Sequence, residues 1–251
     1  VISAIMKQQT TDRARDVINN GMDIHAGSAI CLGENNFMEK FYRSSPIGIT
    51  VEGSNTLTRN LIIFGQGLNK SHPYIYPILE NILNDDAEGF KQNFKNIVSH
   101  SLSMYGQSWM LNSDILDKQT IQFAALANFV ALKGGAIKKD QSLSSDMADL
   151  LSNLYLGHSV RWHQNNFKVS DSLTNYCINR LADENQIIIN RVIDNSGLMK
   201  PLLLHMKKSI KSTSYENNRN LIKEVMNNEK IMNEIKRDVY TKNTVLEELE
   251  K

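Results

Sequence analysis

The chain has 251 residues, 41% hydrophobic and 22% charged, so it can bury a sizeable core and fits no fibrous or disordered class. Its 28 basic and 27 acidic side chains leave a net charge of +1, which supplies no broad positive field, and we expect no nucleic-acid partner. The two cysteines, Cys31 and Cys177, lack metal-ligand spacing and argue against structural zinc and a disulfide framework, so a reducing, cytoplasmic location is expected.

The opening stretch, Val1–Asn20, has apolar residues at helical spacing. Gly21 stands where a helix C-cap would, and a helix is therefore predicted to end near it. Because Val1 already lies within the helical pattern, we expect the chain to be a piece of a longer polypeptide.

The next segment, Met22–Gly53, is rich in Gly, Asn, Ser and Pro and is predicted to be the loop-rich part of the chain, with a helical turn or two around Phe37–Tyr42. Near its end Ile47, Ile49 and Val51 alternate, a pattern that a short strand and an extended loop share. A helix is predicted to follow, with Ser54 as N-cap, Gly65 and Gly67 as terminators, and Leu57, Leu61 and Phe64 on its apolar face.

From about Asn84 onward every apolar pattern has helical spacing, which predicts an all-α fold and a boundary at Asn84–Glu88. The predicted domains are residues 1–83 and a further helical region, 84–251. Five helices are expected in the second region: Phe90–Trp109, Gln119–Lys133, Ser144–Trp162, Ser170–Asp194 (with Ser170 as cap and Gly197 as stop) and Glu216 to about Tyr240.

Glu52 is the residue that we single out for chemistry. Its carboxylate lies between an apolar segment and Gly53, just before a predicted helix N-terminus. Desolvation there would raise its pKa and helix amides would lower it, a balance that suits a general base. A Glu-Gly pair by itself is common, however, and a solvated loop acid is the more frequent outcome.

Two segments give Glu52 a specific context: the loop Met22–Ile30 and the stretch Ile49–Arg59, whose Glu52 follows Asp23 by 29 positions. In this order and spacing they resemble the C-terminal helical domain of the flavin-dependent acyl-CoA dehydrogenases. The resemblance covers almost the whole chain and extends to the large bacterial long-chain members, which carry an extra helical C-terminal region. It is carried further by Phe64–Gly67, His72–Tyr74, Leu132–Gly135, Ser144–Ser152, Leu154–Leu156 and Arg237–Tyr240.

The resemblance implies an oxidoreductase of fatty acid β-oxidation that converts medium- or long-chain acyl-CoA to trans-2-enoyl-CoA. Glu52 would remove the α-proton while a hydride passes from the β-carbon to the flavin, and Gly53 would contact the substrate. The backbone N–H of Glu52 would polarise the thioester carbonyl together with the flavin ribityl chain. A complete enzyme also needs upstream domains of the same polypeptide, so the isolated chain is expected to be inactive.

The resemblance also implies binding of flavin adenine dinucleotide (FAD). Asp23, Ala26 and Gly27 match the loop that contacts the FAD of a neighbouring subunit, and Ser54, Asn55 and Thr56 match residues on its adenosine side. A homo-oligomer and an electron-transfer acceptor protein are therefore expected partners. The family loop reads Gly-Gly-x-Gly, whereas this chain has Ala26-Gly27-Ser28-Ala29, and we expect Ala26 and Ala29 to fit with ordinary φ angles.

Other residues are given structural roles. His25 and His72 are predicted to pack or cap, and Arg59 to be a structural ion-pair partner. The basic, apolar segment Leu198–Lys211 is interpreted as a core helix with a solvated lysine face, with peripheral contact to the inner membrane as an alternative. The rival function for the whole chain is a helical docking or oligomerisation module without turnover, favoured by Ala26 and Ala29.

Overall fold

The computed structural model describes residues 1–110, 114–210 and 214–237, and these consist of helices joined by turns with no strand. The all-α prediction is confirmed. In the part of the chain so described, no helix is long and apolar enough to cross a membrane.

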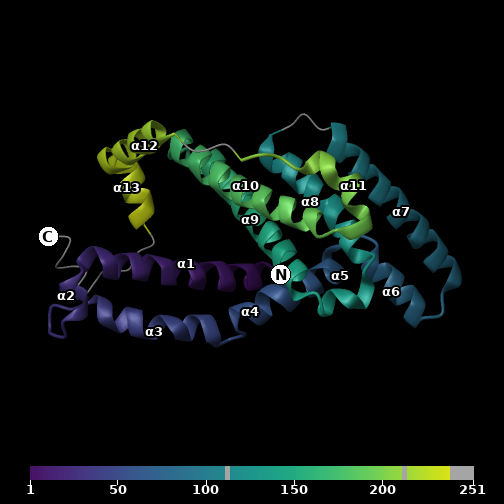
Figure 1. Cartoon of the computed structure of the whole chain (residues 1–251), viewed down its shortest axis with the longest axis horizontal. Coiled ribbons are helices and arrows are strands. Elements are labelled where there is room, and N and C mark those ends of the chain that lie inside the picture. The colour runs from purple at the N-terminus through teal and green to yellow at the C-terminus, as the bar shows by residue number, and fades with distance from the viewer. Residues whose placement is uncertain (111–113, 211–213, 238–251) are drawn as a thin grey trace.

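The chain begins with a long arm of two helices that lie side by side (Figure 1). α1 spans Ile2–His25, the short α2 spans Gly27–Ile30, and α3 spans Met38–Thr50. The prediction that Met22–Gly53 is loop-rich was therefore wrong, since most of it is helical, whereas the helical turns expected around Phe37–Tyr42 belong to α3. No strand forms at Ile47–Val51.

Packing within the arm explains the difference. α1 continues through Gly21, where a Cβ would lie 2.5 Å from the Met38 Cε, so the glycine permits close approach of α3 rather than ending the helix. The Asn36 side-chain oxygen accepts the N–H groups of Met38 (3.1 Å) and Glu39 (2.9 Å) and starts α3. The alternation over residues 47–51 was too short to decide against this helix.

A continuous helical stretch leads from the arm into the body. It consists of α4 (Asn55–Leu57), a π-helical segment (Thr58–Gln66) and α5 (Gly67–Ser71). Ser54 caps its start, as predicted, by accepting the Leu57 N–H at 3.3 Å. The two predicted terminators, Gly65 and Gly67, lie inside the stretch, so the predicted end was wrong.

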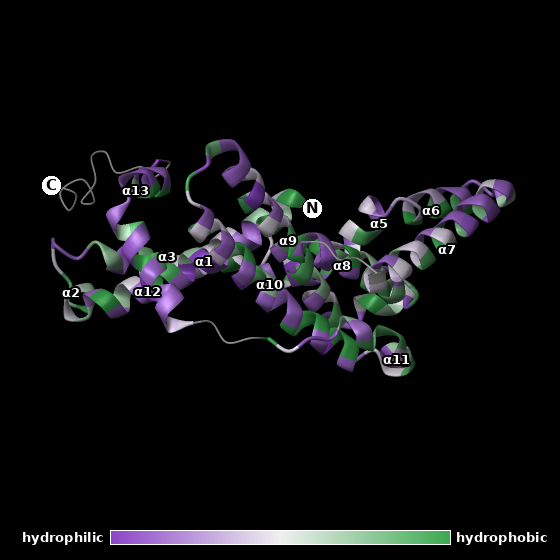
Figure 2. Cartoon of the chain, turned by 90° about the horizontal axis from the view of Figure 1, so that it is seen from above, coloured by the Kyte–Doolittle hydropathy of each residue, from purple (hydrophilic) through white to green (hydrophobic). Residues whose placement is uncertain are grey.

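A helical hairpin projects from the other end of the molecule (Figure 2). It is formed by α6 (Ile75–Leu83) and α7 (Ala87–Met110). The predicted boundary at Asn84–Glu88 falls at its turn.

His72 joins this hairpin to the bundle as a capping residue, in the role predicted. Its Nδ1 accepts the Tyr74 N–H at 3.2 Å, and Nε2 therefore carries the proton and lies 2.9 Å from the Asn128 Oδ1. Burial lowers the pKa of His72, and His100, whose ring centroid lies 5.5 Å away, lowers it further.

The free energy of unfolding should consequently fall as the pH drops below the unfolded-state pKa of His72, because the unfolded chain then binds a proton that the folded chain resists. Protonating Nδ1 also breaks the bond from Tyr74. Urea denaturation at pH 7.5 and 5.5 measures this loss, and it should be smaller in His72→Gln, which has no proton to bind. His205, whose pKa burial also lowers, is present in both proteins. An equal loss in the two proteins would contradict the prediction.

The rest of the chain forms a bundle of long helices. α8 spans Ile115–Ala131, α9 spans Gln141–Phe167 and α10 spans Asp171–Asp194. α10 begins where predicted, because Ser170 accepts the Leu173 N–H at 3.1 Å. The smaller elements that follow are 3₁₀ turns at Gly134–Lys138, Gly197–Met199 and Leu204–Met206, and the helices α11 (Lys200–Leu203), α12 (Tyr215–Asn227) and α13 (Glu229–Lys236).

Two predictions for the C-terminal part need correction. The single helix from Glu216 is broken at Asn228, whose side chain accepts the Lys230 N–H at 3.0 Å and caps α13. Its predicted end at Tyr240 lies outside the described residues. Residues 198–210 form 3₁₀ turns and the four-residue helix α11 instead of one long helix. Lys211 lies outside the described residues.

One hydrophobic core joins both parts of the chain. Ile5, Ile63 and Phe64 from the first part belong to the same buried cluster as the bundle residues. α9 and α10 make the most extensive helix contact and contribute Met147, Leu150, Ile189 and Ile193, all fully buried. The predicted domain boundary between residues 83 and 84 thus does not separate two cores. The division into two domains remains a prediction.

Candidate functional site

Glu52 and Gly53 form a tight turn between α3 and α4. Both have positive φ angles, 55° at Glu52 and 85° at Gly53. A non-glycine residue rarely adopts this left-handed conformation, because its Cβ crowds the backbone, and such strain persists only where surrounding contacts hold it. The turn follows the last helical residue of α3, Thr50.

The Glu52 side chain is exposed. The sequence places Glu52 after an apolar segment, but Val51 beside it is also exposed. A carboxylate in this position is accessible to a molecule bound from outside the chain.

Asn55, three residues after Glu52, faces inward and is only 6% exposed. Its amide nitrogen donates to the Thr11 Oγ1 at 2.8 Å and to the Asp12 Oδ1 at 2.7 Å, both on α1. Its amide oxygen accepts from the Lys7 Nζ at 2.6 Å. These partners occupy the side-chain amide within the chain, and the expected FAD contact at Asn55 stays a prediction. Thr56 is exposed and stays a candidate for the FAD contact. Ser54 is half-buried, and its hydroxyl oxygen accepts the Leu57 N–H.

The other expected cofactor residues lie at the far end of α1. Asp23, Ala26 and Gly27 are exposed at the corner between α1 and α2. Lys7, which contacts Gly53, precedes Asp23 by sixteen residues on the same helix, a rise of about 24 Å at 1.5 Å per residue. The structure therefore does not bring the corner and Glu52 together within one chain (Figure 1).

Ala26 corrects a sequence-based expectation. Its φ of 47° with ψ of −122° is a conformation that favours glycine, not an ordinary one. Ala29 fits as expected, buried within α2.

Ala26→Gly should accordingly raise the free energy of unfolding by about 1 kcal/mol, the relieved strain exceeding the added freedom of the unfolded chain. Ala29→Gly is the matched control, and because Ala29 has an unstrained backbone it should lower that free energy by about 1 kcal/mol. Urea denaturation measures both values. If both variants are destabilised, Ala26 is not strained.

Arg59 ties the π-helical segment to α9. Its Nε donates to the Asp149 Oδ1 at 2.6 Å and its Nη2 contacts the other carboxylate oxygen, so the pair is bidentate. This contact raises the pKa of Arg59. The predicted structural ion pair is confirmed, with Asp149 as the partner.

Within the described residues, three cavities stand out, and Glu52 lines none of these three. A groove of about 990 Å³ between the α6–α7 hairpin and the π-helical segment has an uncharged, mostly apolar lining that includes Leu61, Ile78 and Phe94. A cavity of about 410 Å³ is bordered by Arg59 and Asp149.

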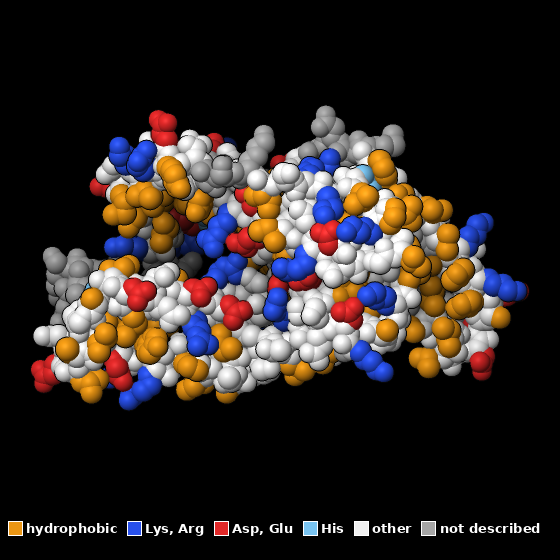
Figure 3. Space-filling model, viewed as in Figure 1, with side chains coloured by type: hydrophobic (Ala, Val, Ile, Leu, Met, Phe, Trp, Pro, Cys, Tyr) orange, Lys and Arg blue, Asp and Glu red, His pale blue; other side chains and the backbone are white. Residues whose placement is uncertain are grey.

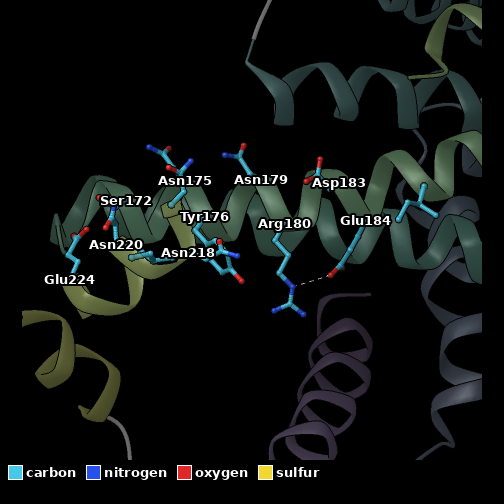
Figure 4. Close-up of a pocket in the computed structure, with 13 residues that line it drawn as sticks. Ser172, Asn175, Tyr176, Asn179, Arg180, Asp183, Glu184, Asn218, Asn220 and Glu224 are labelled. Atoms are coloured by element: carbon cyan, nitrogen blue, oxygen red, sulfur yellow. Dashed lines mark hydrogen bonds and ion pairs between the residues drawn. The ribbon is translucent and has the colours of Figure 1, made fainter. Parts of the chain in front are cut away.

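The third cavity, about 550 Å³, lies between α10 and α12. Figure 4 shows the polar residues of its lining, among which the Arg180 Nε lies 3.3 Å from the Glu184 Oε1. Within the described residues, no cluster of three or more His, Cys, Asp or Glu side chains is placed to hold a metal ion.

Sequence reasoning missed the residues that support the turn. Lys7, Thr11 and Asp12 read as ordinary polar residues of a helix, more than forty positions away from the residues that they contact. The available signal for this support was the i, i+4 spacing of Lys7 and Thr11, which puts both side chains on one helix face.

Comparison with known proteins places the chain in a family. Residues 114–251, more than half of the chain, match the family description "Acyl-CoA dehydrogenase, C-terminal, bacterial type". Among solved structures the fold is similar to that of an acyl-CoA dehydrogenase complexed with FAD from Bacillus anthracis, with a TM-score of 0.66 and 17% sequence identity. The match covers 90% of this chain and 39% of that protein, so the chain spans about two fifths of its length.

Proposed function

The chain belongs to the bacterial-type acyl-CoA dehydrogenase family, and from that premise we propose that it is the C-terminal part of an FAD-dependent enzyme that oxidises medium- or long-chain acyl-CoA to trans-2-enoyl-CoA in fatty acid β-oxidation. The observation that carries the proposal is the left-handed Glu52–Gly53 turn, which presents an exposed carboxylate from a braced position on the arm.

Glu52 acts as the general base of this reaction. Its carboxylate takes the α-proton of the thioester, and the C–H electron pair forms the new double bond as a hydride leaves the β-carbon. FAD, when bound, supplies the acceptor for that hydride. The N–H of Glu52 donates to the thioester oxygen, while Gly53 contacts the substrate. Because Glu52 is exposed in this chain, the remaining domains must cover it and exclude water, and the chain alone is expected to be inactive.

FAD contacts are assigned to two separate places. Ser54, Asn55 and Thr56 are assigned to the cofactor's adenosine side. The corner with Asp23, Ala26 and Gly27 serves the FAD of a neighbouring subunit, an arrangement supported by its distance of about 24 Å along α1 from the Gly53 contact. The Gly27 corner is open, since a Cβ there would meet no atom within 4 Å.

Assembly with further subunits and domains is supported by the arm's apolar surface (Figure 3). Ile24 is 80% exposed and Leu32 is 81% exposed, so the arm leaves large apolar side chains in water that a partner would bury. Upstream domains of the same polypeptide and a second copy are the occupants proposed for this surface. An electron-transfer acceptor protein is the proposed partner for reoxidation of the flavin.

Peripheral membrane contact by Leu198–Lys211 receives little support. Leu203 and Met206 are buried in the core, and Lys200 and Lys207 pair with Asp194, each at 2.7 Å. Flotation with anionic liposomes tests this membrane contact. A double variant, Lys207→Glu with Lys208→Glu, that floats as well as the unaltered protein would contradict it.

The proposal is tested by expressing the complete coding frame that contains this chain. We expect a yellow protein with bound flavin, whose absorbance near the visible flavin maximum bleaches on addition of a sixteen-carbon acyl-CoA. A colourless but folded protein would instead favour the docking or oligomerisation module. The exposed arm is also compatible with that function. A stop codon just upstream of Val1 would favour the same reading.

A further inference from the structure

The left-handed turn at Glu52 and Gly53 is held by one side chain from α1. The Lys7 ammonium donates to the Gly53 carbonyl oxygen at 2.7 Å and to the Asn55 amide oxygen at 2.6 Å. Lys7 is half-buried, and both bonds are charge-assisted and short. Thr58 adds a weaker third contact, since its Oγ1 lies 3.3 Å from the same Gly53 oxygen.

The Gly53 carbonyl needs such a donor. It lies between α3 and α4, and no backbone N–H of the described residues donates to it. Without the ammonium, the oxygen would depend on the longer bond from Thr58. The positive φ of Glu52 carries a conformational cost, which the surrounding contacts must outweigh.

Asn55 transmits the contact from Lys7 into α1. Lys7 is a donor only, and Asp12 is an acceptor only, so the direction of the Asn55 amide is determined: oxygen toward Lys7 and nitrogen toward Asp12 and Thr11. The amide dipole thereby lies between a cation and an anion in a buried position. Gly53 and Asn55, the two residues that flank Ser54, are thus both bonded to α1.

We propose that Lys7 is a positioning residue for Glu52: it fixes the Glu52–Gly53 turn by binding the Gly53 carbonyl and the Asn55 amide, and so sets the direction of the Glu52 carboxylate and N–H. The effect on turnover rests on the proposed function, whereas the effect on the turn does not. Lys7 itself touches neither substrate nor cofactor in this assignment.

The turn is tested on the full 251-residue chain by hydrogen exchange of the Leu57 and Thr58 amides, which depend on Ser54 at the turn. Lys7→Met removes the donor and should speed their exchange by about 10- to 100-fold, while amides of α10 change by less than about twofold. Lys91→Met, at an exposed lysine of α7, is the control and should change neither. Unaltered exchange at Leu57 and Thr58, or an equal rise throughout the bundle, would overturn the proposal.

Lys7→Arg keeps the test decisive if Lys7→Met does not fold. It retains the charge and the donors and should preserve most of the protection of Thr58. If a folded Lys7→Arg chain loses as much protection at Thr58 as is expected when the donor is deleted, that result would also count against the proposal.

Turnover by the complete flavin-loaded enzyme supplies the second readout. Lys7→Met should lower kcat by about tenfold or more with KM within about threefold, because a misdirected base impairs the chemical step rather than substrate binding. Lys7→Arg should restore most of kcat. A normal kcat in Lys7→Met overturns the positioning role. If the turn loosens but Glu52→Gln keeps its turnover, the bracing by Lys7 stands and the proposed function fails.

Discussion

Glu52→Gln is expected to lower the turnover of the complete flavin-loaded enzyme by about 10²- to 10⁴-fold or more, the contribution of a positioned general base. Gln keeps the size and shape of the side chain and removes its basicity. The α-hydrogen of a thioester is so weakly acidic that no solvent base replaces the carboxylate. Flavin content should stay unchanged, since no cofactor contact is assigned to the Glu52 side chain.

Stopped-flow bleaching of the flavin by acyl-CoA measures this effect as a single turnover, separately from product release. Glu88→Gln is the matched control, an exposed glutamate at the start of α7, and should react at the normal rate. A Glu52→Gln enzyme that bleaches within about tenfold of the unaltered rate would exclude Glu52 as the base.

Leu150→Ala should produce the largest loss of stability, lowering the free energy of unfolding by about 2–5 kcal/mol. Leu150 is fully buried, at 0% exposure, in the core shared by α9 and α10. The substitution removes three carbons and leaves a cavity that the long helices on both sides cannot close, because they are anchored along their length.

Urea denaturation measures this loss, and Leu198→Ala supplies the control. Leu198 is 98% exposed, so the same chemical change there should alter the free energy by less than about 0.5 kcal/mol. A change in the m-value for Leu150→Ala would indicate a partly unfolded state. Equal effects of the two substitutions would mean that α9 and α10 do not form the stabilising core.

Some properties followed from the sequence alone because they are local or are carried by short motifs. Helical spacing beyond residue 84 predicted the all-α class, and the caps at Ser54 and Ser170 were placed correctly because a cap depends on atoms three residues away. The resemblance to acyl-CoA dehydrogenases rested on the order and spacing of two segments, and the family match confirms it.

Other properties were decided only by the tertiary structure. Gly21 was predicted to end a helix, and Pro46 belongs to the segment predicted to be loop-rich, yet both lie in helices, because packing between α1 and α3 outweighs these local preferences. The left-handed conformation of Ala26 could not be predicted either, since local preference opposes it and only surrounding contacts can impose it.

The candidate site shows the same division. Glu52 was identified from its motif, but its exposure, its positive φ and its support by Lys7 were not, because Lys7 and Gly53 are 46 residues apart and leave no local pattern. Asn55 matched a cofactor residue by motif, whereas its inward orientation depends on α1. The sequence determined which chemical groups the chain carries, and long-range packing decided which of them face solvent, because burial is a property of the whole fold.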